Sequence, residues 1–227
     1  MNSFTPTPDD QTILKVLVGS RAHGLHNAQS DYDYRGVFVT PTNKILSLNP
    51  GYKNTQWIEG DIDNTSWELG HFLHLATKCN PTILETFLSP VEETTALGEE
   101  LRALFPYIWN SQGVRDAFIG YGLNQRKKFL DGKDGRPAKF AVAYARSLYN
   151  GKELLESGTF TVNISGLAIG ALLKEWKAGN YKVGSVIDVC VELEADVRKA
   201  YINNPNKVTD MGKVNEFLLK VRKLNFT

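Results

Sequence analysis

The feature that most constrains this chain is the stretch from Val16 to Val39, V-L-V-G-S-R-A-H-G-L-H-N-A-Q-S-D-Y-D-Y-R-G-V-F-V. A short, β-branched apolar run from Ile13 to Val18 is typical of a buried strand, and it stops at Gly19-Ser20. Glycine allows a sharp turn and a close approach to a ligand, and serine caps a short helix well, here over about Arg21 to His26. The free N–H groups at such a helix start suit a phosphate.

Two aspartates follow this turn. After a second turn at Asn27 to Ser30, Asp31 and Asp33 precede another strand, Tyr34 to Val39. Side chains alternate along a strand, so Asp31 and Asp33 project from the same face. Neighbouring carboxylates repel each other unless a cation lies between them, and Mg²⁺ prefers carboxylates together with substrate phosphates and water. The order of turn and acid pair therefore predicts metal-assisted chemistry on a nucleoside triphosphate.

Each half of this pattern has a plainer interpretation. A Gly-Ser turn is a common loop, and Asp-x-Asp is often the solvated start of a strand. The two occur here together, in this order and after a buried strand, and the combination favours the functional interpretation.

The segment from Gly19 to Phe38 resembles the signature of the DNA polymerase β nucleotidyltransferase superfamily, a Gly-Ser turn followed by a D-x-D strand. It is more closely similar to a bacterial and phage family of predicted nucleotidyltransferases associated with RNA repair. The similarity continues through N-P-T-I-L-E-T-F-L-S-P at residues 80–90 and the later helices, so it covers most of the chain. The resemblance implies that Gly19 and Ser20 hold triphosphate oxygens, and that Asp31 and Asp33 are catalytic ligands of Mg²⁺ or Mn²⁺.

The resemblance also implies a third carboxylate on a neighbouring strand. We expect that strand at Thr55 to Asp63, where Glu59, Asp61 and Asp63 share one face. Asp63 is favoured as the third metal ligand because it lies just ahead of a helix expected at 66–78, and Asp61 is the reserve. In the alternative interpretation, Asp63 caps a helix that begins near Thr65.

The second half of the chain reads as helical. Helices are expected at 82–87, 95–104, 114–130, 137–151, 166–178, 183–203 and 213–223. The change from strands to helices predicts an α+β protein: a small mixed sheet with flanking helices in a catalytic domain of residues 1–110, and a helical domain of residues 111–227. Glu85, on the first of these helices, could approach the active site, but a solvated helix face is the favoured interpretation.

Several cations are candidates for binding the nucleotide. Lys139 and Arg146 lie seven residues apart on one predicted helix, so they point the same way about two turns apart. The resemblance supports a Lys and an Arg here, although relatives tend to carry a histidine between them where this chain has Ala-Val-Ala-Tyr. The alternative is a solvated basic face. Arg21 and Arg35 are close in sequence to the acid pair.

Charge, cysteine and histidine usage limit the binding partners, the compartment and the metal sites that we expect. A formal net charge of +1 removes any global electrostatic argument for nucleic acid or membrane, although residues 122–146 are locally basic. Cys79 and Cys190 form no metal or redox motif and are expected to be core thiols in a reducing compartment. The pairs His71/His74 and His23/His26 lack a supporting cysteine, so we expect surface or polar-edge histidines rather than a zinc site.

The chain begins without signal-peptide regions and holds no apolar run that could span a bilayer, so we expect a cytoplasmic protein without a membrane partner. The resemblance implies transfer of a nucleoside monophosphate (NMP) from a nucleoside triphosphate (NTP) to an acceptor hydroxyl. An RNA end is favoured as the acceptor. Transfer of AMP to a protein hydroxyl, as in toxin–antitoxin relatives, and a non-catalytic nucleotide-binding module are the alternatives.

Overall fold

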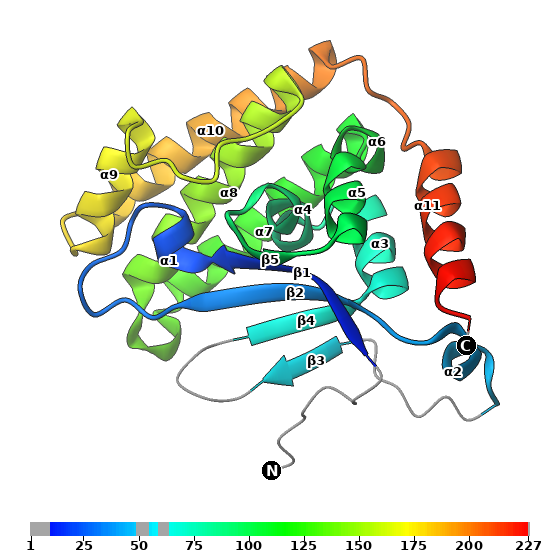
Figure 1. Ribbon diagram of the computed structural model, residues 1–227. Coiled ribbons are helices and arrows are strands. Elements are labelled where there is room, and N and C mark those ends of the chain that lie inside the picture. Colours follow the sequence, from blue (N-terminus) through cyan, green and yellow to red (C-terminus); the bar gives the residue numbers. More distant parts are fainter. Residues whose placement is uncertain (1–9, 49–54, 59–63, 227) are drawn as a thin grey trace.

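The computed structural model describes residues 10–48, 55–58 and 64–226 (Figure 1). Within these residues, a five-stranded mixed sheet has the strand order β3-β4-β2-β1-β5. The strands are β1 (Gln11–Val18), β2 (Asp33–Val39), β3 (Thr55–Ile58), β4 (Asn64–Glu68) and β5 (Val91–Thr94). Strands β2 and β4 run parallel, and the other neighbouring pairs are antiparallel. The α+β class with a small mixed sheet is confirmed.

The β1–β2 pair sets the geometry of the site. Its register places Val18, the last residue of β1, opposite Asp33, the first residue of β2. The connection contains the short helix α1 (Gly19–Ala22). The helix expected at 21–26 is therefore wrong in its bounds, because Gly24 takes a left-handed conformation (φ +69°) that ends it. The antiparallel return brings the start of β2 back to the glycine bend.

Residues 64–68 correct a second expectation. The helix predicted from Ser66 begins only at Leu69, as α3 (Leu69–Thr77), because the preceding residues pair with β2 as strand β4. The side chain of Glu68 caps α3 by accepting a hydrogen bond of 2.7 Å from the N–H of Gly70. The alternative in which Asp63 caps a helix near Thr65 is therefore wrong. Glu59, Asp61 and Asp63 themselves lie outside the described residues.

The long helices lie to one side of the sheet (Figure 1). The shorter helices, besides α1 and α3, are α2 (Thr42–Leu46), α4 (Pro81–Leu88), α5 (Ala96–Ala103) and α6 (Phe105–Ile108). The remainder are α7 (Ser111–Leu130), α8 (Pro137–Ser157), α9 (Ala168–Lys177), α10 (Val183–Asn203) and α11 (Met211–Leu224), with a 3₁₀ turn at Lys133–Gly135. The seven helices expected from residue 82 onward are confirmed, with shifted ends. The edge strand β5 was not predicted, since its residues are exposed and carry no apolar alternation.

A chain of aromatic contacts links the sheet to the helical half. Ring centroids are 5.1 Å apart between Phe72 and Phe87, and 5.9 Å between Phe87 and Phe105. Phe160 lies 6.3 Å from both Phe105 and Phe118. This buried cluster crosses the predicted boundary between residues 110 and 111, so the two halves pack against each other. The division into domains 1–110 and 111–227 remains a prediction.

Helix α11 returns to the far end of the sheet. There the guanidinium of Arg222 donates two hydrogen bonds, of 2.7 and 2.9 Å, to the buried carboxylate of Glu68. The hydroxyl of Thr42 donates to the carbonyl of Arg222 at 2.7 Å. These hydrogen bonds hold the C-terminal helix α11 against the start of α3. No helix in the described part of the chain is long and apolar enough to cross a membrane.

Candidate active site

A cavity of about 600 Å³ lies between the β1–β2 connection and the helices α7, α8 and α9. Its wall on the sheet side includes residues of the glycine bend and the acid pair. Its wall on the helical side is largely basic. The lining residues that matter for the chemistry are Gly19, Ser20, Asp31, Asp33, Arg35, Tyr121, Arg136, Lys139, Arg146 and Lys177. Most of the residues predicted from the sequence thus meet in one hollow.

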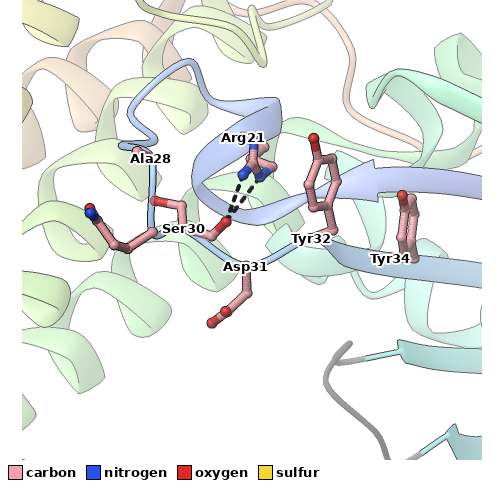
Figure 2. A pocket seen from close by; sticks show the side chains of 7 residues that line it. Arg21, Ala28, Ser30, Asp31, Tyr32 and Tyr34 are labelled. Carbon is pink, nitrogen blue, oxygen red and sulfur yellow. Dashed lines mark hydrogen bonds between the residues drawn. The ribbon is translucent and has the colours of Figure 1, made fainter.

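The acid pair lies directly beside the glycine bend. A methyl group added at Gly19 would lie 2.2 Å from Oδ2 of Asp33, so the carboxylate packs against the bend itself. Gly19 also has a φ of +68°, a conformation that favours glycine. Asp31 is exposed and lines the same cavity from the connection. Its side chain points away from those of Tyr32 and Tyr34 (Figure 2).

This donor set fits a divalent cation. Two carboxylates converge on one cavity, and hard cations such as Mg²⁺ prefer oxygen ligands. Among residues 10–48, 55–58 and 64–226, however, no three His, Cys, Asp or Glu side chains gather closely enough to form a metal site. A complete cluster needs a further ligand, and the candidates Asp61 and Asp63 lie outside the described residues.

The opposite wall carries positive charge. Lys139 and Arg146 project from α8, Arg136 precedes that helix and Lys177 ends α9. The ammonium of Lys177 donates to the carbonyl of Leu25 at 2.8 Å. Burial and the neighbouring charge of Lys139 lower the pKa of Lys177. Two cations held this close favour an anion between them, just as the acid pair favours a cation.

Arg21 has a different place. Its Nε and Nη2 donate to the carbonyl of Ser30 at 3.1 and 2.8 Å, and its guanidinium lies 3.8 Å from the ring centroid of Tyr32 (Figure 2). It therefore joins the two arms of the β1–β2 connection. It lines a neighbouring hollow and does not contribute to the wall of the main cavity.

A buried ion cluster forms the floor of the cavity. The carboxylate of Glu85, only 4% exposed, accepts a hydrogen bond from Nη1 of Arg146. Its Oε1 lies 3.0 Å from Nε2 of His23 and 3.7 Å from Nη1 of Arg35. The interpretations of Glu85 as part of a solvated face and of His23 as a surface or polar-edge histidine are wrong, because each is buried against the other. The signal available in the sequence is an acid inside the apolar run I-L-E-T-F of residues 83–87.

The cluster fixes the charge states of its members. Burial alone raises the pKa of Glu85, but Arg146, His23 and Arg35 outweigh it and hold that pKa well below its ordinary value. Burial, reinforced by Arg146, lowers the pKa of His23 despite the opposing effect of Glu85. Near neutral pH, Glu85 is therefore ionised and His23 is neutral. Arg146 is consequently anchored by a buried, charged partner.

Comparison with known proteins fits this geometry. A family model described as the RNA repair pathway DNA polymerase beta family matches residues 2–177. The chain belongs to this family. Membership of the RNA repair pathway DNA polymerase beta family places it among the polymerase β-like nucleotidyltransferases. The matched region ends at Lys177, so it contains every cavity residue named above.

Individual relatives are more distant. The chain is 29% identical over 134 residues to the uncharacterized protein YcgL of Bacillus subtilis, covering 56% of this chain and 50% of the relative. It is 24% identical over 132 residues to an uncharacterized 38.9 kDa protein of Enterobacteria phage T4, covering 52% of this chain and 39% of the relative. The chain thus spans half or less of these curated relatives.

A solved structure of a nucleotidyltransferase-like protein from Exiguobacterium sibiricum 255-15 aligns with 96% of this chain and 75% of its own. Its TM-score is 0.31 at 10% identity, too low to support an inference.

Replacing Gly19 by alanine tests whether activity depends on the close packing of Asp33 against the glycine bend. The added methyl would meet Oδ2 of Asp33, and alanine is strained at the φ of +68° that Gly19 adopts, so Asp33 or the bend must move. A displacement of about 1 Å at a reacting centre costs roughly a hundredfold in rate, and we expect that loss in kcat for any reaction that uses this cavity. Gly120→Ala is the matched control, because nothing lies within 4 Å of a side chain added there. Equal activity in the two variants would contradict the proposed close approach.

The pH dependence of stability tests the buried cluster. In the unfolded chain His23 has its ordinary pKa of 6.5, and folding lowers that pKa. Below pH 6.5 the unfolded state therefore binds a proton that the folded state does not bind. The free energy of unfolding then falls as the pH is lowered. Glu85 adds a loss in the same direction, but only below its ordinary pKa of 4.5.

The measurement is the free energy of unfolding in urea at pH 7.5 and 5.5. His23→Gln keeps a hydrogen-bonding side chain but cannot titrate in this range. Between pH 7.5 and pH 5.5, the free energy of unfolding of the wild type should fall by up to about 1.4 kcal/mol more than that of this variant. The figure follows because pH 5.5 lies one unit below the ordinary pKa of His23. The same pH dependence in both proteins would show that His23 is protonated in the folded state.

Proposed function

We propose that the protein is a metal-dependent nucleotidyltransferase that moves NMP from an NTP to an acceptor hydroxyl, with an RNA end as the acceptor. The observation that carries the proposal is the cavity in which a carboxylate pair beside a glycine bend faces a basic wall. A triphosphate needs cations on one side, and a bound divalent cation needs carboxylates on the other. The cavity provides both the cationic side chains and the carboxylates.

The triphosphate would lie between the bend and helix α8. Backbone N–H groups at Gly19 and Ser20, with the hydroxyl of Ser20, would hold its outer phosphates. Lys139 and Arg146 would contact the same oxygens from α8. Because Glu85 anchors Arg146 through one Nη atom, the remaining guanidinium N–H groups keep a fixed direction.

The carboxylates would hold the metal. Asp31 and Asp33 would bind Mg²⁺ or Mn²⁺, and Asp63 would complete the cluster. When bound, such cations lower the pKa of the attacking hydroxyl and neutralise the departing pyrophosphate. The acceptor oxygen forms a bond to the α-phosphorus, its proton passes to a carboxylate or to water, and the bond to the pyrophosphate breaks. The chain's own contribution is positioning and charge stabilisation.

The acceptor and the cellular setting are part of the proposal. The family description refers to RNA repair, and the cavity is basic on its helical side. Both favour a polyanionic acceptor such as an RNA end. The two cysteines are buried and unpaired, as is usual in a reducing compartment, and we place the protein in the cytoplasm.

The test is an incubation with Mg²⁺ and each NTP labelled at the α-phosphate, offered RNA, DNA of the same sequence, and protein acceptors. We expect the label on RNA, and binding of that RNA should weaken as salt rises. Label on protein alone would replace the acceptor by a protein hydroxyl. Mg²⁺-dependent NTP binding without any transfer would overturn the enzyme and leave a binding module.

A further inference from the structure

A second hollow, of about 470 Å³, adjoins the active-site cavity (Figure 2). The two hollows share the residues Ser30, Asp31 and Tyr34. A molecule in the second hollow therefore lies next to one of the two acids of the candidate catalytic pair.

The second hollow presents two neighbouring aromatic rings. Tyr32 and Tyr34 project to the same side, with ring centroids 6.5 Å apart and planes inclined by only 18° (Figure 2). Tyr32, the last residue before β2, is 48% exposed. The side chain of Asp31 points away from these two rings, although Asp31 and Tyr34 each line both hollows (Figure 2).

Cations flank both rings. The guanidinium of Arg21 lies 3.8 Å from the centroid of Tyr32, and the ammonium of Lys15 lies 4.8 Å from that of Tyr34. Lys15 also pairs with the exposed Glu93 at 2.9 Å, so it is already partly neutralised. The strip therefore runs cation, ring, ring, cation. We call Arg21, Tyr32, Tyr34 and Lys15 the tyrosine strip.

Partly exposed aromatic rings beside cations are the chemistry that binds single-stranded nucleic acid. Unpaired bases stack on aromatic ring faces, and cations attract the phosphates. Arg21 and Lys15 each lie over one ring, so a base would stack on the ring faces that these cations leave open. Bases within a duplex are already stacked on each other and cannot use such a surface without being pulled apart.

We propose that the tyrosine strip binds the unpaired end of the acceptor strand. This inference rests on the proposed function, and it identifies the acceptor as a single-stranded end. A strand stacked on Tyr32 and Tyr34 would reach the acid pair through the shared residue Asp31, so its terminal hydroxyl would enter the cavity beside the NTP. The NTP itself occupies the main cavity, where the basic wall lies.

The test is fluorescence anisotropy with a short labelled single-stranded RNA, without NTP, on Tyr32→Ala/Tyr34→Ala. Loss of base stacking typically weakens binding about tenfold or more, and we expect Kd to rise by that amount. Tyr32→Phe/Tyr34→Phe keeps both rings and should bind as the wild type does. Tyr107→Ala is the matched control, because Tyr107 is also exposed and lies 3.5 Å under the cation of Lys213, but outside both hollows.

Two further measurements make the result decisive. A blunt duplex of the same sequence should bind equally to all variants, and calorimetry should show the same NTP affinity. Unchanged RNA binding in the double alanine variant would overturn the proposal, as would an equal loss in Tyr107→Ala. Lost NTP affinity with RNA binding intact would assign the strip to the nucleobase of the NTP and also overturn it.

RNA binding is measured without turnover. The proposal for the tyrosine strip and the proposed function can therefore be refuted by different results. Wild-type protein that binds RNA through the strip but transfers no nucleotide would refute the function and leave the strip standing.

Discussion

Nucleotide incorporation is expected to fall by at least about a thousandfold when Asp31 and Asp33 are both replaced by alanine, because the charge stabilisation supplied by a divalent cation is worth several kcal/mol. The fold should survive, since Asp31 is exposed and Asp33 is only partly buried at the start of its strand. Near-ultraviolet circular dichroism and the urea midpoint check the fold, and incorporation of labelled NMP measures the activity.

The control for the acid pair is Asp188→Ala, which removes an exposed acid of α10 outside the cavity. That variant should retain full activity. Turnover by the double variant at the wild-type rate would show that the carboxylates beside the glycine bend do not take part in the reaction.

Replacing Glu85 by alanine is expected to have the largest effect on stability. The change leaves Arg146, His23 and Arg35 around a buried site with no carboxylate. Removing one partner of a buried ion pair costs about 3–5 kcal/mol, and we expect that loss in the free energy of unfolding in urea. Arg146 also loses its anchor, so kcat/KM should fall by roughly a hundredfold at a temperature where the variant is still folded.

Glu68→Ala separates these two effects of Glu85. Glu68 is likewise a buried carboxylate held by an arginine, Arg222, but it lies at the far end of the sheet outside the cavity. We expect a comparable loss of stability with unchanged NTP affinity. If both variants weakened NTP binding equally, the role of Glu85 would be structural only. A Glu85→Ala protein as stable as the wild type would refute the buried cluster.

Local sequence signals predicted which residues lie together on the sheet side of the cavity. The bend and the acid pair lie within one strand–turn–strand unit, so alternation and glycine chemistry are enough to group Gly19 with Asp31 and Asp33. The same alternation contained the signal for Tyr32 and Tyr34, which our prediction did not use. These groupings need no knowledge of the rest of the chain.

Signals that depend on distant contacts failed. Residues 64–68 look like the start of a helix, and only pairing with β2 some thirty residues earlier makes them a strand. The partners of Glu85 come from residues 23, 35 and 146, so no local pattern could show that it is buried with them. The spacing of Lys139 and Arg146 correctly suggested one helix face, but it could not show that Arg146 is held by Glu85.

The most direct test of the central claim follows the two ends of the triphosphate. Wild-type protein is mixed with Mg²⁺, a single-stranded RNA and an NTP labelled either at the α-phosphate or at the γ-phosphate. Transfer of NMP predicts that the α label appears on the RNA and that the γ label leaves as pyrophosphate, with both signals lost on chelation of the metal. Release of the γ label as single phosphate, with no α label on any acceptor, would contradict nucleotidyl transfer.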